Sequence, residues 1–155
     1  MQPNPPQLQP LADIDRYYPR LGEAIQRYRA LLTSFMRPAL VDLCRLRIAQ
    51  IVRGSDVPLI EPSEAQTAGI TPAQLAELAT WHTSDQFDAT ERACLELAEY
   101  FCYSAQSVRD EHIAEVSAHL TAEQVLSLTN AIWVSDSSER LYNYLESLGA
   151  TEATR

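Results

Sequence analysis

Three helix-start signatures constrain the fold of this 155-residue chain more than any other feature of its sequence. Each has a side-chain acceptor three residues before a glutamine or glutamate, so that each side chain can accept a hydrogen bond from the other residue's backbone N–H. The three pairs are Thr71 with Gln74, Asp88 with Glu91, and Thr121 with Gln124. A helix is therefore predicted to follow each pair, and no strand-like alternation of useful length competes with them.

The first half of the chain also has helical periodicity. Apolar residues recur at steps of three and four after Ile14, at Leu21, Ile25, Tyr28, Leu31 and Leu32. Pro38 suits the first turn of a second helix that ends near Gly54, and Pro62 suits a short helix that Gly69 closes.

Three helices are predicted in the second half of the chain. The first follows Asp88, the second spans about Asp110 to His119, and the third follows Thr121. The last of them turns Val125, Leu128 and Ile132 inward, with Leu141 and Leu145 on its continuation. We therefore predict one all-α bundle of about six or seven helices over residues 13–150. Residues 1–12 form an extended proline-rich arm in this prediction, and 151–155 form a C-terminal tail.

Charge and composition exclude several classes of function. The net charge is −9, and the twelve basic residues, all arginines, are scattered, which argues against nucleic acid as a partner. No apolar run approaches the roughly 18 residues of a membrane span, and no secretory signal is apparent at the N-terminus, so we expect a cytoplasmic protein without a membrane partner.

The cysteines and histidines show no metal-site or redox spacing. Cys44, Cys94 and Cys102 contain no CxxC pair, and on one helix the last two would lie about 12 Å apart, beyond disulfide reach. We expect all three to be free, buried thiols. The histidines, His82, His112 and His119, lack the HxxxH spacing, so neither a metal nor a cofactor is predicted, and a surface or supporting role is expected for His82.

The segment LVDLCRLRIAQIVRGSDVPLIEPSEAQTAG, residues 40–69, resembles the AhpD-like and carboxymuconolactone decarboxylase superfamily, which includes alkylhydroperoxidase-like antioxidant proteins. The residues that keep the family frame are Asp42, Leu46, Arg47, Ala49, Gln50, Ala65, Ala68 and Gly69. The stretches FDATERACLELAEYF from Phe87 and HLTAEQVLSLTNAIW from His119 are similar to the two following helices of the family. This resemblance implies an AhpD-like helical bundle that forms homo-oligomers, commonly dimers, trimers or hexamers.

The reacting groups of the family are replaced in this chain. Gly54 and Val57 stand where the redox branch has its two cysteines, and Glu61 stands at the histidine position. Asp42 alone keeps the acidic character of the family's proton-relay glutamate. The resemblance therefore implies a catalytically degenerate, non-redox binding or assembly protein, a pseudoenzyme, with a small organic molecule as a further candidate partner.

An alternative keeps the chain an enzyme. A member of the same superfamily, of the alkylhydroperoxidase and peroxiredoxin type or of the decarboxylase type, would use Asp42 and Glu61 as proton-transfer groups. The resemblance also implies that five acidic residues lie near one another. They would form a cation-binding pocket or be solvated surface charges. These residues are Asp42, Asp56, Glu61, Asp136 and Glu139.

Two charged residues and the two tryptophans have separate interpretations. Asp42 is also suited to a structural salt bridge with Arg45, and Arg140 to pairing with an acidic group inside the chain. Trp81 and Trp133 are interpreted as core or interface anchors rather than as stacking partners of a cofactor.

Overall fold

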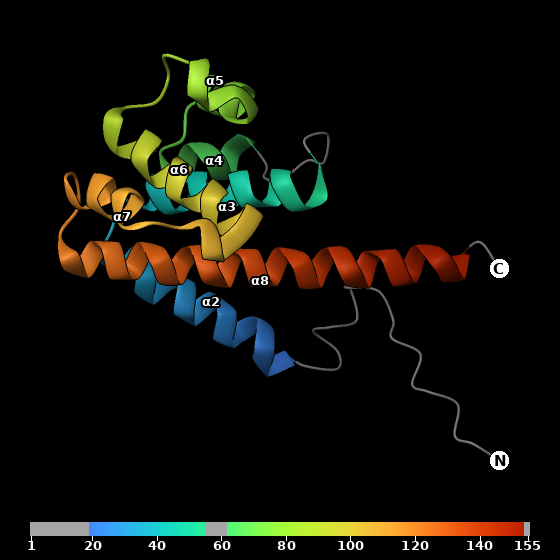
Figure 1. The fold of residues 1–155 in the computed structure, drawn as a ribbon. Helices are drawn as coiled ribbons and strands as arrows, with labels where there is room; N and C mark the ends of the chain where they lie inside the picture. Colours follow the sequence, from blue (N-terminus) through green and yellow to red (C-terminus); the bar gives the residue numbers. More distant parts are fainter. Residues whose placement is uncertain (1–18, 55–61, 154–155) are drawn as a thin grey trace.

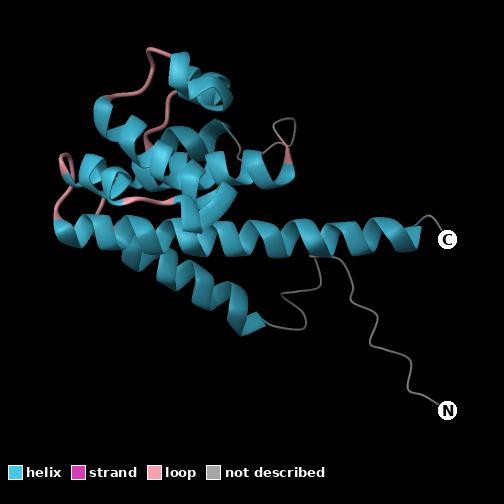
Figure 2. Cartoon of the chain, in the orientation of Figure 1, coloured by secondary structure: helices cyan, strands magenta, loops and turns pink. Residues whose placement is uncertain are grey.

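The structure is a computed structural model that describes residues 19–54 and 62–153. Within these ranges it is helical with short loops and contains no strand, as the sequence predicts (Figure 2). The α-helices are α2 (Pro19–Thr33), α3 (Pro38–Arg53), α4 (Pro62–Ala68), α5 (Pro72–Glu77), α6 (Ala89–Ser104), α7 (Asp110–Ser117) and α8 (Ala122–Ala153). Two 3-10 helices, η2 (Leu78–Thr83) and η3 (Ala105–Ser107), follow α5 and α6.

All three predicted capping boxes are present. The N–H of Glu91 donates to Asp88 at 2.8 Å, and the N–H of Asp88 donates to the Glu91 carboxylate at 3.0 Å, which fixes the start of α6. The equivalent pairs start α5 and α8. A single hydrogen bond, absent from the sequence prediction, lies at the start of α7, where the N–H of Arg109 donates to Nδ1 of His112 at 3.0 Å.

Glycines end the two helices that were predicted to end with them. Gly54 follows α3 with a φ of 99°, and Gly69 follows α4 with a φ of 88°. Backbone in this left-handed region favours glycine because a Cβ would be strained there.

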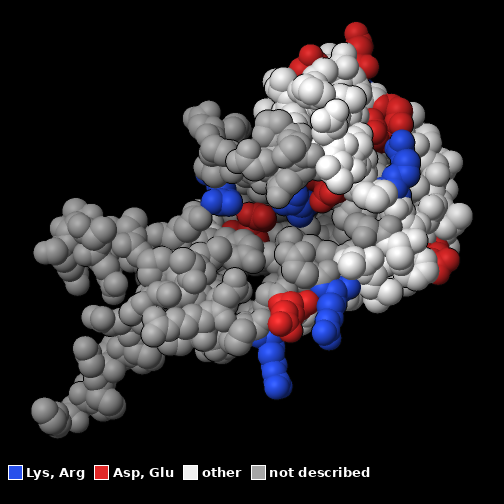
Figure 3. Space-filling model, turned by 180° about the vertical axis from the view of Figure 1, so that it is seen from behind, with Lys and Arg blue, Asp and Glu red and all other residues white. Residues whose placement is uncertain are grey.

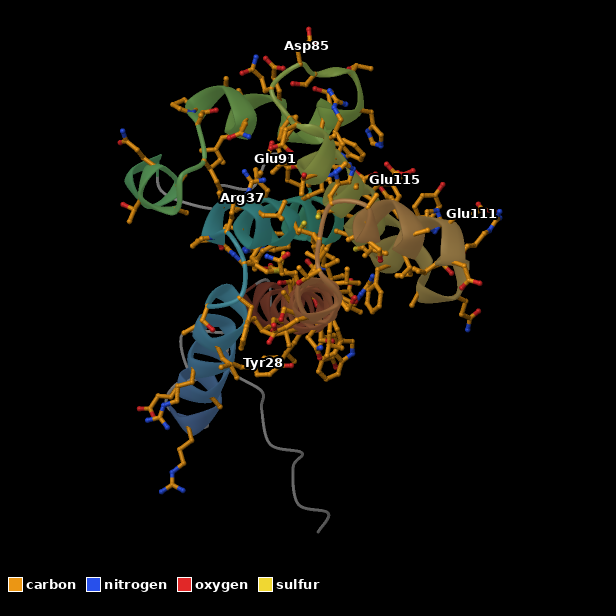
Figure 4. All side chains as sticks on the ribbon, turned by 90° about the vertical axis from the view of Figure 1, so that its left-hand side faces the viewer. Tyr28, Arg37, Asp85, Glu91, Glu111 and Glu115 are labelled. Atoms are coloured by element: carbon orange, nitrogen blue, oxygen red, sulfur yellow. The ribbon has the colours of Figure 1, made fainter. Side chains whose placement is uncertain are left out.

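Helix α3 is the centre of the core and packs against both α6 and α8 (Figure 1). Helix α2 packs against α8, and α7 packs against α6 and α8. The most deeply buried large side chains come from these helices and the connecting segments, namely Leu40, Leu43, Leu46, Ile48, Ile70, Leu78, Leu95, Leu128 and Ile132. At its N-terminal end, α3 is also tied to α6 by an ion pair of 3.4 Å between Arg37, which Figure 4 labels, and Asp88.

Helix α8 differs from the prediction in two respects. It reaches Ala153, three residues into the expected C-terminal tail. Leu141, expected to point inward, is exposed, and so is Trp133, whereas Trp81 lies in the core. The inward prediction fails at Leu141 because this residue lies on the side of α8 that faces away from the body, whereas Ser138 and Glu139 just before it are buried. The side chain of Leu145 and the arm at 1–12 lie outside what the structure describes.

Candidate functional site

The structure locates Asp42 and Gly54 among the predicted site residues. Asp42 lies on α3 with a half-buried side chain, and Nε of Arg45 donates to its carboxylate at 3.1 Å. This is the salt bridge anticipated from the sequence. Gly54 is exposed at the end of α3. Val57 and Glu61, together with Asp56, lie outside the described residues, so a site formed by Asp42 and Glu61 remains a prediction.

The three thiols are free and buried, as expected. Burial raises the pKa of Cys94 to about 12 and that of Cys102 also to about 12, and it raises the pKa of Cys44 well above the ordinary thiol value. At pH 7 a thiol with a pKa of about 12 is ionised in roughly one molecule in 10⁵. Because the thiolate is the nucleophile, these sulfurs are poorly suited to attack a peroxide or a disulfide.

Arg140 connects the last helix to α6. Its Nη2 donates to the backbone carbonyl of Cys102 at 2.6 Å, and its Nε donates to Asp136 at 2.9 Å. The hydrogen bond with Asp136 raises the pKa of Arg140, and Asp136 adds to the effect of burial on the pKa of Cys102. Arg140 thus pairs with an acidic group inside the chain, as interpreted from the sequence. Glu139 lies 3.9 Å from Arg53 on α3.

A buried glutamate on α6, Glu99, contacts three side chains from two other elements. Its Oε1 accepts hydrogen bonds from Nε of Arg47 on α3 and, at 2.8 Å, from Nε1 of Trp81. Nε2 of His82 lies 3.3 Å from its other oxygen. Burying a carboxylate is costly unless donors surround it, and the hydrogen bonds from Arg47 and Trp81 supply that compensation here.

Each partner of Glu99 is held by further contacts. Nη1 of Arg47 donates to Gln50, one turn along α3, at 3.2 Å. The rings of Trp81 and His82 stack with their centroids 3.8 Å apart, which fixes the orientation of the imidazole. Trp81 is buried in this stack, while the side chain of His82 remains 56% exposed. The Arg47–Glu99–Trp81–His82 cluster therefore runs from the core to the surface.

This geometry suits a proton-transfer group at the surface. Nε2 of His82 is the nitrogen that lies near Glu99, so the other ring nitrogen, Nδ1, takes no part in this contact. A carboxylate that orients a histidine is part of the arrangement that general-base histidines use. His82 thus lies in the supporting or surface position expected for it, with a carboxylate partner that the sequence analysis missed.

A separate pocket of about 560 Å³ lies between α6 and α7. Its wall includes Tyr100 and His112, whose rings pack with centroids 4.0 Å apart, and the carboxylates of Glu96, Glu111 and Glu115. Glu111 and Glu115 project from α7 on the outer side of the molecule (Figure 4). Among the residues that the structure describes, no group of three or more histidine, cysteine or acidic side chains is placed to hold a metal ion.

The charged surface contains no stripe of one sign on the face drawn in Figure 3, where the basic and acidic side chains lie next to one another. Within the described ranges, no helix combines the length and apolarity needed to cross a membrane.

No protein-family model matches the chain, and a search of curated proteins finds no match. The resemblance to the AhpD-like superfamily therefore rests on the sequence motifs around Asp42, Phe87 and His119 alone.

Proposed function

We propose that this chain is a non-redox member of the AhpD-like superfamily that works by binding or assembly and not by thiol chemistry. The observation that carries the proposal is the state of its three thiols, which are buried and have pKa values raised far above neutral pH. The sequence supports it further, because Gly54 and Val57 offer no sulfur at the positions of the family's cysteine pair.

Thiol reactivity tests this proposal directly. In Ellman's assay at pH 7.5 the native protein should react with far less than one thiol in the first minutes, and after unfolding in guanidinium it should react with three. With dithiothreitol as the reductant, the protein should consume no hydrogen peroxide or organic hydroperoxide above the protein-free rate. A rapidly labelled native thiol, together with peroxide turnover that Cys44→Ala abolishes, would overturn it.

The alternative is an enzyme that moves protons on a small organic acid or lactone, with Asp42 and Glu61 as the transfer groups. The specific observation that favours an acid–base enzyme is the His82–Glu99 pair, which supplies an exposed imidazole oriented by a buried carboxylate. Substrate screening followed by Asp42→Asn, Glu61→Gln and His82→Asn tests this alternative. An activity that falls at least 100-fold in one of these variants, with unchanged circular dichroism, identifies the proton-transfer group.

A further inference from the structure

The outer face of α8 carries large apolar side chains that the rest of the described chain leaves uncovered. Leu126 is 66% exposed, Trp133 57% and Tyr144 56%, and Leu141 is also exposed. At 100° per residue, Leu126, Trp133 and Tyr144 point within about 20° of one direction, and Leu141 lies about 60° to one side. They form one row about 27 Å long, which we call the α8 row.

The opposite side of α8 is already occupied by the body of the protein. Leu128, Ile132 and Ser135 are buried there, and α8 packs against α3. Helix α2 lies along one flank, where the hydroxyl of Tyr28 donates to Asn130 at 3.1 Å (Tyr28 is labelled in Figure 4). Leu31, exposed on α2, adds to the apolar surface. The α8 row is therefore an apolar face rather than a few isolated exposed residues.

We propose that a second copy of this chain covers the α8 row, with the two α8 helices packed antiparallel about a two-fold axis. The proposal rests on the assembly function proposed above and names its partner. An axis level with Ser135 places Leu126 of one copy opposite Tyr144 of the other, because these residues lie equally far from it along the helix. The same axis places Trp133 opposite Ser137, a small exposed residue that leaves room for the indole.

Charge and area both suit a like partner. The chain carries a net charge of −9, yet no carboxylate points within about 60° of the direction of the α8 row between Leu126 and Tyr144. Two copies can therefore approach along this face without placing like charges in contact. The exposed surfaces of the four row residues and Leu31 amount to roughly 600 Å² per copy, against the about 800 Å² per partner of a standard interface that also includes a polar rim.

Sedimentation equilibrium from 1 to 100 µM tests the interface. The wild-type chain should behave as a dimer, and Trp133→Glu should raise the dissociation constant at least ~30-fold, because a charge then replaces a central aromatic anchor. Tyr100→Glu is the control, since Tyr100 is an exposed aromatic residue on α6 that packs on His112 of α7 and not on α8. It should leave the dimer unchanged, and circular dichroism should match for all three proteins.

Distances between spin labels on the two copies, measured by electron paramagnetic resonance, test whether the α8 helices pack antiparallel or parallel. A spin label on Glu123→Cys should give a distance between copies of roughly 36 Å for antiparallel helices that cross level with Ser135, and about 10 Å for parallel ones. The native cysteines are buried, and the unsubstituted chain is the labelling control.

A monomeric wild type at 100 µM, a Trp133→Glu protein that still dimerises as before, or the short distance would each overturn the antiparallel dimer. A monomer whose thiols are inert overturns the dimer alone, whereas reactive thiols with peroxide turnover overturn the non-redox proposal whatever the oligomeric state.

Discussion

Two regions of the molecule depart from the usual pattern of apolar groups inside and charged groups outside. One is the contact between α3 and α6, and the other is the outer face of α8. In the first, a charged pair, Arg47 and Glu99, lies inside the protein with Trp81 donating to the same carboxylate. In the second, Leu126 and Trp133 lie outside it. The difference is that the buried charges find their partners within the chain, whereas the apolar row finds none in the described residues. The first region therefore bears on the stability of one copy, and the second bears on association.

The largest effect is expected from Glu99→Ala. It leaves the Arg47 guanidinium and the Trp81 indole N–H buried without their acceptor, and breaking one side of a buried ion pair costs about 3–5 kcal/mol. Urea unfolding followed by circular dichroism measures the loss. Glu23→Ala, at an exposed glutamate of α2, is the control and should stay within about 0.5 kcal/mol of wild type. A loss below about 1 kcal/mol for Glu99→Ala would mean that the buried Glu99 carboxylate is not stabilised by its donors as described above.

The second-largest effect is expected at alkaline pH, which should lower the free energy of unfolding. The pKa of Cys94 is raised to about 12 in the folded chain, so between about pH 9 and pH 12 the folded state holds a proton that the unfolded state has released. The free energy of unfolding must then fall as pH rises through this window. Cys94→Ala lacks this titrating thiol. The difference in free energy of unfolding between wild type and Cys94→Ala should therefore narrow from pH 9 to pH 12. Tyrosine titration affects both proteins alike and cancels in this difference. A constant difference would contradict the burial of this thiol.

A smaller effect is expected at the start of α6. Asp88→Ala removes the acceptor for the Glu91 N–H and should cost about 1 kcal/mol in urea unfolding. Asp88→Asn keeps an acceptor and should recover most of the loss. Asp85→Ala, in the exposed loop just before the cap (Figure 4), should change little. Equal losses at Asp85 and Asp88 would argue that general charge, and not the cap, matters here.

The smallest effect on the single folded copy is expected at the α8 row. Leu126→Ser should change the free energy of unfolding by no more than about 0.5 kcal/mol at concentrations where the chain is monomeric, since the side chain is already in water. At concentrations that favour the dimer, the same variant should become measurably less stable than wild type. The comparison of the two regions fails if Leu126→Ser destabilises the dilute chain by 2 kcal/mol or more.

Local signals predicted the helices well. Capping pairs such as Asp88 with Glu91 are separated by three residues, so their hydrogen bonds follow from spacing alone. The ends of α3 and α4 followed in the same way from Gly54 and Gly69. The pairing of Asp42 with Arg45 also lies within one helical turn and was predictable for that reason.

The Arg47–Glu99–Trp81–His82 cluster was not predictable in the same way, because its members meet only after α3, η2 and α6 pack together. A signal was nevertheless present. Arg47 lies on the apolar side of α3 beside Ile48, and Glu99 lies on the apolar side of α6 beside Ala98. A charged residue on the buried face of each of two neighbouring helices indicates a pair, although it does not say which helices become neighbours.

The loop from His82 to Asp88 takes its shape from Arg92, which lies on the helix that follows it. The Arg92 guanidinium donates to the backbone carbonyls of Trp81, His82, Ser84 and Phe87. Because Arg92 contacts backbone carbonyls, substitutions of the exposed side chains of Thr83, Asp85 and Gln86 should leave these hydrogen bonds in place. Sequence drift in this loop should therefore leave the imidazole of His82 in place, and a change at Arg92 should disturb it from ten residues away.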